Sequence, residues 1–464
     1  MKTGYWVICL CIYSFSLAAQ PVKERLAKAV DILQSDPQMK HALLGLQVIN
    51  AQTGDKVFEV NAQTGLAPAS CQKIITSVAA LELLGPAYRY ETLLGYTGKI
   101  SRNTLQGDLY LLGSGDPSLG SWRYDSTRED RQMQELTKIL TQSGIRKITG
   151  NLVGYSGKWE QETLPGGWIW DDIGNYYGAG TSALNWHENQ YDLILRSGKN
   201  IGDTVDIIET RPALTGTNLQ SQLLAAAKGT GDNAYVYLPP FASQGFVRGT
   251  IPVEEKAFVI SGSFPDPALQ TTSTLQQSFE LAGIRLQGGV NVSYDKAVPQ
   301  VQNLGKLISP RLDSLNYWFM RKSINLYGEA FLKTIAFEKT GKGSTDKGVG
   351  LVKKFWKEQG ISSAALQIID GSGLSPQNRV TADALVQALQ YARGRSWYPA
   401  FYESLPFFNQ MKLKSGTIGG TKSFAGYHTS KEGVTYTVAI IINNYDGSAG
   451  EIVKKMFRVL DTLK

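Results

Sequence analysis

The spacing of apolar residues near the two ends of the chain predicts two parts of one β-sheet. Residues 22–33 have apolar side chains at helical spacing, and 44–49 and 56–60 alternate as strands around a Thr53-Gly54-Asp55 turn. Near the other end of the chain, the same alternation predicts three more strands, at 411–417, 423–429 and 434–443. A helical pattern follows them at 451–463. If the two ends share one sheet, the residues between them include an insertion.

The middle of the chain contains two copies of one pattern, a helix followed by a Gly-Ile turn and a strand. The turns are Ser143-Gly144-Ile145 and Ala282-Gly283-Ile284, and another glycine follows each, Gly150 and Gly288. Because their apolar positions match only loosely, we interpret the copies as two similar helix–strand units, without assigning a duplication. Between them, an aromatic stretch at 159–186 and a polar one at 193–262 predict a further insertion of short strands.

These patterns predict a mixed α/β (α+β) chain whose main domain is discontinuous. A length of 464 residues is enough for roughly two to four domains. The boundaries that we expect are 20–91 with 300–464 for the main domain, 92–299 for the insertion, and 92–160 with 263–299 and 161–262 for two nested parts of the insertion.

Composition and charge exclude few classes of protein. With 42% hydrophobic and 19% charged residues, the chain has the ordinary mixture of a folded protein. The net charge is +7, but the 47 basic and 40 acidic residues are interspersed, with no basic block of the kind that binds nucleic acid. The excess of basic residues would suit an anionic cell wall or membrane surface, although a solvated surface with a slight excess of lysine explains the charge better.

The first residues are typical of a secretory signal. Lys2 precedes an apolar stretch at 5–17, and small residues close the segment, so we expect a signal peptide at 1–19 and export of the mature chain. The apolar stretch is shorter than the ~20 residues of a spanning helix. Because Cys9 and Cys11 lie in this segment, the mature chain keeps only Cys71 and can form no internal disulfide.

The chain has too few histidines for most hydrolytic mechanisms. Its three histidines are isolated, and His187-Glu188 lacks the second histidine of a zinc-peptidase helix, so we expect no metal and no other cofactor. Serine activated by lysine remains, and three Ser-x-x-Lys matches occur, at Ser70, Ser293 and Ser344. Only Ser70 is followed by an apolar helical run, at 74–81.

The spacing at Ser70 would serve nucleophilic catalysis. At the start of a helix, a separation of three residues places the Ser70 hydroxyl beside the Lys73 amine. Burial and nearby positive charge would lower the pKa of Lys73, so that its neutral amine could take the serine proton. The motif alone also fits a serine that caps a helix and a lysine exposed to solvent.

Two further segments make the catalytic interpretation stronger. Ser323-Ile324-Asn325 precedes a helical stretch at 326–337, where the hydroxyl could relay a proton and the amide could hold a substrate carbonyl. Lys-(Ser/Thr)-Gly occurs at 339–341 and at 414–416. We favour Lys414-Ser415-Gly416, because it lies on a predicted strand whose edge could pair with an extended peptide, whereas Lys339 ends a helix.

Together and in this order, these three segments resemble the motifs of penicillin-binding proteins and serine β-lactamases. More narrowly, the chain is similar to the three-domain D-alanyl-D-alanine carboxypeptidase/endopeptidase family of low-molecular-weight penicillin-binding proteins. The segments that carry this resemblance are 68–73, 113–117, 168–172, 323–325 and 370–375. The resemblance implies a penicillin-binding/serine β-lactamase-like catalytic domain interrupted by smaller domains.

The resemblance also implies roles for individual residues. These are Ser70 as nucleophile, Lys73 as general base, Ser323 as proton shuttle, Asn325 as ligand of a substrate amide, Lys414 as electrostatic partner, Ser415, Gly416 and Thr417 as binders of the substrate and its carboxylate, and the backbone N–H groups of Ser70 and Thr417 as oxyanion hole. Asp172 would meet the amino end of a diaminopimelate-type side chain, with Asp171 as its rival.

The implied substrate is the stem peptide of peptidoglycan, and β-lactams are the implied covalent inhibitors. The sequence does not separate removal of terminal D-alanine from cleavage of cross-links. Three residues depart from the usual motifs: Ile324 for Asp, Ser415 for Thr and Cys71 for Thr. The alternatives are a catalytically weak or non-catalytic wall-binding protein on this scaffold, and a β-lactamase or esterase, whose deacylating motif is not evident.

Overall fold

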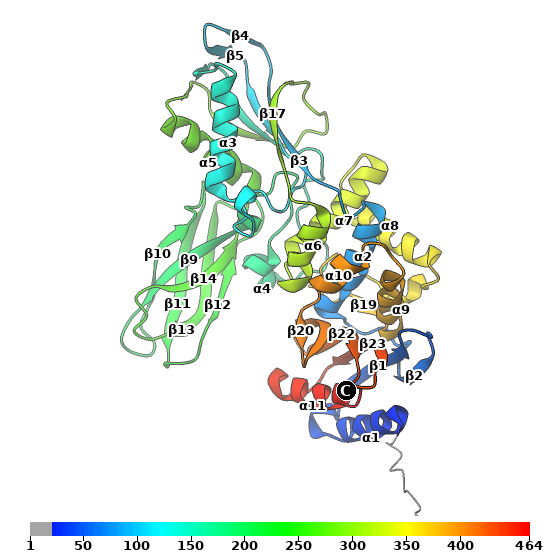
Figure 1. Cartoon of the computed structure of the whole chain (residues 1–464). Coiled ribbons are helices and arrows are strands. Elements are labelled where there is room, and N and C mark those ends of the chain that lie inside the picture. Colours follow the sequence, from blue (N-terminus) through cyan, green and yellow to red (C-terminus); the bar gives the residue numbers. More distant parts are fainter. Residues whose placement is uncertain (1–20) are drawn as a thin grey trace, which may run out of the picture.

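A computed structural model describes residues 21–464, so the signal peptide expected at 1–19 lies outside the described residues. Strands from both ends of the chain form one antiparallel sheet in the order β2-β1-β23-β22-β21-β20 (Figure 1). Their bounds are β1 Leu43–Asn50, β2 Lys56–Val60, β20 Phe407–Phe408, β21 Met411–Ile418, β22 Thr421–Thr429 and β23 Thr435–Asn443. The sheet therefore joins segments that the whole middle of the sequence separates.

Helices cover both faces of this sheet. On β23, Val438 and Ile440 pack with α1 and α11, whereas Ala439 and Ile441 belong to the larger core on the opposite face. The bounds of the helices are α1 Val22–Gln34, α11 Ala449–Asp461 and, on the opposite face, α2 Lys73–Leu83, α6 Leu312–Arg321, α7 Asn325–Thr340, α8 Thr345–Glu358, α9 Ala382–Arg393 and α10 Tyr398–Ser404. Because both faces are buried, β23 is apolar without interruption from Val438 to Ile442.

The two similar helix–strand units of the middle region lie side by side. Strands β8 and β16 pair in parallel, as do β7 and β15, and the helices that precede them, α3 and α5, contact each other. The sheets are β16-β8-β6-β3-β17 and β15-β7-β5-β4. The bounds are α3 Glu129–Gln142, α5 Pro267–Leu281, β3 Glu91–Tyr96, β4 Lys99–Ser101, β5 Thr104–Gln106, β6 Leu109–Leu112, β7 Lys147–Ile148, β8 Leu152–Tyr155, β15 Arg285–Leu286, β16 Val290–Ser293 and β17 Gln302–Ile308.

Strand β17 corrects one expected boundary. It pairs antiparallel with β3, so the inserted sheet continues to Ile308, whereas the sequence suggested that the main domain resumes at 300. The strand is mostly exposed or half-buried, and its pattern does not indicate which sheet it joins. Local alternation predicts a strand but not its partner.

Short strands form the outer part of the insertion. They make the sheets β10-β9-β14 and β11-β13-β12, with bounds β9 Gln190–Ser197, β10 Val205–Arg211, β11 Asn218–Ala226, β12 Asn233–Tyr237, β13 Gln244–Pro252 and β14 Phe258–Ser263. One hydrophobic cluster includes residues from both parts of the insertion, such as Leu94 and Val236. The short helix α4 (Trp170–Ile173) contacts β12.

Two features complete the description of the main domain. Strands β18 (Leu366–Gln367) and β19 (Arg379–Val380) pair at the two ends of the segment that contains Asp370. No helix within residues 21–464 is both long enough and apolar enough to cross a bilayer.

Candidate active site

Ser70 lies in a tight turn that precedes α2. The turn, Ala69–Gln72, is a 3₁₀ helix and α2 begins at Lys73, so Ser70 stands one short turn before the α-helix that the sequence indicated. Ala69 is fully buried at φ +47°, a left-handed conformation that is uncommon for a residue with a Cβ. Strained backbone of this kind persists only where the surrounding structure holds it, and active sites are one such place.

Strands β21 and β22 hold this turn in place. The Ser423 hydroxyl donates to the Pro68 carbonyl over 2.6 Å. A Cβ on Gly416 would lie 2.6 Å from that carbonyl oxygen and 2.8 Å from the Ser70 nitrogen, closer than real Cβ contacts allow. Glycine at 416 therefore lets β21 lie directly against the turn that presents Ser70.

Lys73 is completely buried and contacts three polar groups. Its Nζ lies 3.0 Å from Ser70 Oγ, 2.6 Å from Asn325 Oδ1 and 2.7 Å from the Ser372 carbonyl oxygen. Burial, and secondarily the positive charge of Lys414, hold the pKa of Lys73 well below its usual range.

These contacts fit a neutral Lys73. A neutral amine has two N–H donors and one lone pair, and both Asn325 Oδ1 and the Ser372 carbonyl can only accept. Asn325 Nδ2 donates to the Tyr177 carbonyl over 2.7 Å, which keeps Oδ1 turned toward Lys73. In a neutral Lys73 that donates to these two acceptors, the lone pair is left for the remaining neighbour, the Ser70 hydroxyl, 3.0 Å from Nζ.

The Ser372 carbonyl belongs to a loop organised around buried carboxylates. Five N–H groups donate to the Asp370 carboxylate, from the backbones of Gly373 and Ser375 and the side chains of Gln72, Asn378 and Trp168. The Glu329 carboxylate accepts from the Gly371 N–H, and burial raises the pKa of Glu329 to about 8. The resemblance included 370–375, but sequence reasoning gave this loop no role.

The third motif lies on β21. Lys414 is buried, its Nζ donates to the Ser415 carbonyl over 2.7 Å, and burial lowers the pKa of Lys414 to about 8. β20 pairs only with the first two residues of β21, so the edge from Lys414 to Ile418 faces away from β22 without a strand partner among the described residues. Lys422, which sequence reasoning missed, donates to the Thr417 hydroxyl over 2.6 Å.

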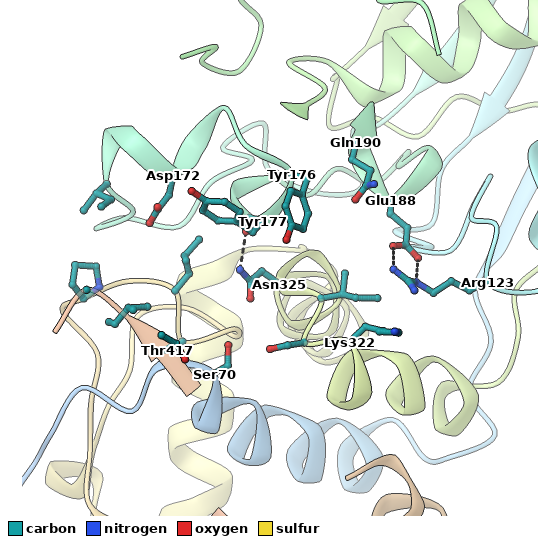
Figure 2. Close-up of a pocket in the computed structure, with 18 residues that line it drawn as sticks. Ser70, Arg123, Asp172, Tyr176, Tyr177, Glu188, Gln190, Lys322, Asn325 and Thr417 are labelled. Carbon is teal, nitrogen blue, oxygen red and sulfur yellow. Dashed lines mark hydrogen bonds and ion pairs between the residues drawn. The ribbon is translucent and has the colours of Figure 1, made fainter. Parts of the chain in front are cut away.

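A cavity of about 560 Å³ lies above Ser70. Figure 2 shows Ser70 and Thr417 on one side of it and Asp172, Tyr176 and Tyr177 on the other. Ser323, Asn325 and Thr417 also line the cavity, whereas Lys73 and Lys414 are buried behind this surface. Ser415 and Gly416 do not line it.

Ser323 lies in the segment between α6 and α7. It adopts φ +58° and lines the cavity, and its hydroxyl makes no hydrogen bond to another described residue. The hydroxyl is therefore free to exchange a proton with a group in the cavity.

The structure distinguishes Asp172 from Asp171. The Asp171 carboxylate accepts from the Tyr237 hydroxyl over 3.0 Å and does not line the cavity, whereas Asp172 does. Partial burial and, secondarily, the charge of Asp171 raise the pKa of Asp172 to about 6.

The other two Ser-x-x-Lys matches do not bring their serine and lysine side chains together among the described residues. Ser293 ends β16 and its hydroxyl lies 3.3 Å from Asp295, while Ser344 precedes α8. Among the described residues, neither serine is hydrogen-bonded to the lysine three positions later. Lys339 ends α7, and Gly341 closes that helix at φ +72°.

Sequence reasoning missed an ion pair at the far end of the cavity. Arg123 donates from Nε and Nη2 to the two oxygens of Glu188, over 2.6 and 2.8 Å. Glu188 lies in a turn whose residues 187–189 all have positive φ, between 52° and 54°. A turn of three consecutive non-glycine residues in this conformation has no reliable sequence signal.

The geometry of this site indicates a class of enzyme. A serine hydroxyl beside a buried lysine amine, at the floor of a cavity and beside an open strand edge, is the site of an acyl-enzyme hydrolase. The family model for D-Ala-D-Ala carboxypeptidase 3 (S13) matches residues 26–463. The chain therefore belongs to the D-Ala-D-Ala carboxypeptidase 3 (S13) family, whose members are serine DD-peptidases.

Individual proteins resemble the chain over nearly its whole length. A D-alanyl-D-alanine carboxypeptidase of Actinomadura sp. is 26% identical, with 91% of this chain and 82% of the relative covered. The D-alanyl-D-alanine carboxypeptidase DacB of Haemophilus influenzae is also 26% identical, over 92% of this chain and 90% of the relative. The crystal structure of penicillin binding protein 4 from H. influenzae matches with a TM-score of 0.80, at 24% identity, over 93% of this chain and 98% of that one. This likeness supports the fold.

Proposed function

We propose that Ser70 attacks a D-alanyl carbonyl of a peptidoglycan stem peptide and that Lys73 takes the serine proton. The observation that carries the proposal is the set of three contacts of Lys73, two to obligate acceptors and one to Ser70 Oγ. The Ser70 oxygen forms an ester with the acyl carbon, and the C–N bond breaks. The leaving amine gains a proton through Ser323, and water then hydrolyses the ester.

The remaining motif residues would bind the substrate and stabilise charge. The backbone N–H groups of Ser70 and Thr417 would receive the oxyanion, as expected for a turn that lies against an open strand. Ser415, Thr417 and the charge of Lys414 would hold the carboxylate that follows the scissile bond. The 2.6 Å bond from Lys422 to Thr417 Oγ1 supports this arrangement, because the Thr417 proton is then free for the substrate.

The acyl side of the substrate would extend toward Asp172. The half-buried Asp172 carboxylate lines the cavity, and an ammonium group on the stem-peptide side chain would be its natural partner. The two parts of the fold would then have different functions. The discontinuous domain at 20–91 and about 309–464 would provide the reacting groups, and the insertion would recognise the side chain of the stem peptide.

The proposed reaction also indicates where the enzyme acts and which compounds inhibit it. The signal predicted at 1–19 and a peptidoglycan substrate both indicate a periplasmic or cell-envelope enzyme. β-Lactams would acylate Ser70, since their strained amide occupies the place of the D-alanyl bond. The net charge of +7 would favour loose association with an anionic wall or membrane surface.

Hydrolysis in ¹⁸O-labelled water tests the proposal. Purified protein is incubated with muropeptides that end in D-Ala-D-Ala, and the masses of the products are measured by mass spectrometry. We expect release of D-alanine and one ¹⁸O atom in the new acyl carboxylate, with neither in Ser70→Ala. Hydrolysis by Ser70→Ala at a wild-type rate would contradict the proposal.

A further inference from the structure

The outer sheet of the insertion has aromatic side chains on its solvent-facing side. Burial alternates along β12, and Tyr235 and Tyr237 lie on the side of the strand that faces away from the core. Their partners on β13 are Arg248 and Phe246. We refer to these four residues, together with Trp170 of α4, as the aromatic face.

The side chains of the aromatic face hold one another in place. Tyr237 and Phe246 stack with their ring centres 4.9 Å apart, and the Trp170 ring centre lies 5.7 Å from that of Tyr237. The Arg248 guanidinium lies 5.1 Å from the centre of the Phe246 ring. Its Nε and Nη2 donate to the Gln222 side-chain oxygen over 3.2 and 2.9 Å. A surface whose side chains are already held in this way loses less conformational entropy when it binds a ligand.

Two rings of the aromatic face are open to solvent, and unused hydrogen-bond donors surround them. Trp170 is 48% exposed and Tyr235 is 42% exposed. Four donors make no hydrogen bond to another described residue: Trp170 Nε1, the Tyr235 hydroxyl, Gln222 Nε2 and Arg248 Nη1. Exposed apolar surface with a polar rim is typical of an interaction site.

The chemistry of the aromatic face suits a carbohydrate. Sugar rings present C–H groups that pack against the negative face of an aromatic ring, and their hydroxyl and acetamido oxygens accept from N–H and O–H donors. The charge of Asp171, whose carboxylate accepts from the Tyr237 hydroxyl, offsets the charge of Arg248. The aromatic face therefore has no large net charge that would favour a strongly anionic or cationic polymer.

The aromatic face lies beside the cavity that contains Ser70. Figure 1 shows α4 next to β12, and α4 carries both Trp170 and Asp172, which lines the cavity. Tyr177 also lines the cavity. Burial, and then the nearby Asp172 and Tyr235, raise the pKa of Tyr177, so Tyr235 lies close to the cavity wall. A polymer on the aromatic face would thus lie next to a peptide whose side chain meets Asp172.

We propose that the aromatic face is a carbohydrate-binding site for the glycan strand to which the stem peptides are attached, with Trp170 and Tyr235 as the stacking residues. The identity of the sugar, an N-acetylated amino-sugar polymer, rests on the proposed function. No bond of the glycan is broken. A bound strand would hold the enzyme on the wall and raise the effective concentration of stem peptides near Ser70.

Binding to glycan strands without stem peptides tests the site separately from catalysis. An amidase removes the peptides, and calorimetry measures binding by wild type, Trp170→Ala, Tyr235→Ala and the control Phe241→Ala. Phe241 is a 41% exposed aromatic residue of the insertion that lies outside the aromatic face. The titration is run in about 0.5 M salt, because the carboxylates that the amidase frees would otherwise attract a protein of net charge +7. We expect Kd to rise about fivefold in each of the first two variants and to keep its wild-type value in Phe241→Ala.

Hydrolysis shows whether the bound strand presents its peptides to Ser70. The ratio of kcat/KM for strand-linked pentapeptides to that for the free pentapeptide should fall about fivefold in Trp170→Ala and in Tyr235→Ala. Wild-type protein that binds no glycan, or variants that both bind it as tightly as wild type, would overturn the carbohydrate site and leave the proposed function intact. Glycan binding by a wild-type protein that hydrolyses no stem peptide would contradict the proposed function while supporting the carbohydrate site.

Discussion

In the proposed reaction Lys73 acts as a base, and its contacts leave room for that role. Its Nζ faces two groups that only accept and one hydroxyl that can donate. A substitution that keeps the two N–H donors but removes the basic nitrogen separates hydrogen bonding from proton uptake. Glutamine is such a side chain, because its Nε2 group donates twice and does not take a proton.

We therefore expect Lys73→Gln to lower the rate of acylation by benzylpenicillin about a thousandfold, the usual range for loss of a general base. Stopped-flow acylation measures the rate, and a melting curve verifies that the variant is folded. Acylation within about tenfold of wild type in a folded Lys73→Gln protein would exclude Lys73 as the base.

Because of the two buried lysines, activity should first rise and then fall as pH increases. Below its lowered pKa Lys73 is protonated and cannot act as base, so activity rises with pH through that value. The pKa of Lys414 is lowered to about 8, so its positive charge is lost above this pH and carboxylate binding weakens. We expect kcat/KM for a D-Ala-D-Ala peptide to fall above about pH 8, and Lys414→Gln to have a lower plateau without this alkaline limb. An unchanged alkaline limb in Lys414→Gln would assign it to another group.

Asp172 should discriminate between substrates by charge. Its pKa is raised to about 6, so the carboxylate is mostly ionised above this pH and mostly neutral below it. The preference for a stem peptide with a free side-chain amine over the N-acetylated peptide should rise as pH increases through 6. In Asp172→Ala, we expect this preference to fall about ten- to a hundredfold and to lose its pH dependence, with a much smaller change in benzylpenicillin acylation. Equal losses with penicillin and the amine-bearing peptide would indicate a structural role for Asp172.

At the scale of elements, the site depends on how closely β21 approaches the turn before α2. Gly416→Ala would place a methyl group 2.6 Å from the Pro68 carbonyl oxygen, so the strand or the turn must shift. We expect a loss of about 1–3 kcal/mol in stability and a fall of about a hundredfold in acylation rate. Gly350→Ala, on the exposed surface of α8 with open space around it, is the control and should stabilise the protein by about 0.5–1 kcal/mol. Normal acylation by Gly416→Ala would show that the close approach is unnecessary.

The elements themselves follow largely from local sequence. Alternation predicted β1, β2 and β21–β23 within a few residues, because strands buried on one or both faces have strong patterns. The Ser70 motif was separated from Ser293 and Ser344 by the apolar helix after it. The partner of β17 and the 3₁₀ turn at Ser70 were not predictable in this way, since both depend on contacts with segments distant in the sequence.

At the scale of the whole molecule, the insertion is joined to the main domain by buried polar contacts beside the cavity. Trp168 donates to Asp370, Asn325 donates to the Tyr177 carbonyl, and Tyr327 donates to Glu188. Each contact joins residues at least 139 positions apart, which is why sequence reasoning gave the Asp370 loop no role. The insertion therefore forms one wall of the cavity.

We expect these contacts to make the two parts unfold together. Glu188→Ala leaves the mostly buried Arg123 guanidinium without its partner, which should destabilise the protein by about 3–5 kcal/mol. Tyr327→Phe removes one neutral donor and should cost about 1–3 kcal/mol, because the hydrogen bond is to a charged group. Calorimetry should show a single transition in wild type and in Tyr327→Phe. Two separate wild-type transitions, or a Glu188→Ala protein as stable as wild type, would contradict this coupling.

Mapping the site of covalent modification by a fluorescent penicillin tests the assignment of the nucleophile most directly. Labelled protein is digested, and the modified peptide is identified by mass spectrometry. The structure predicts one adduct, on Ser70, its absence from Ser70→Ala, and no modification of Ser293 or Ser344. An adduct on either of those serines, or labelling that persists in Ser70→Ala, would contradict the assignment of Ser70 and Lys73 as the reacting pair.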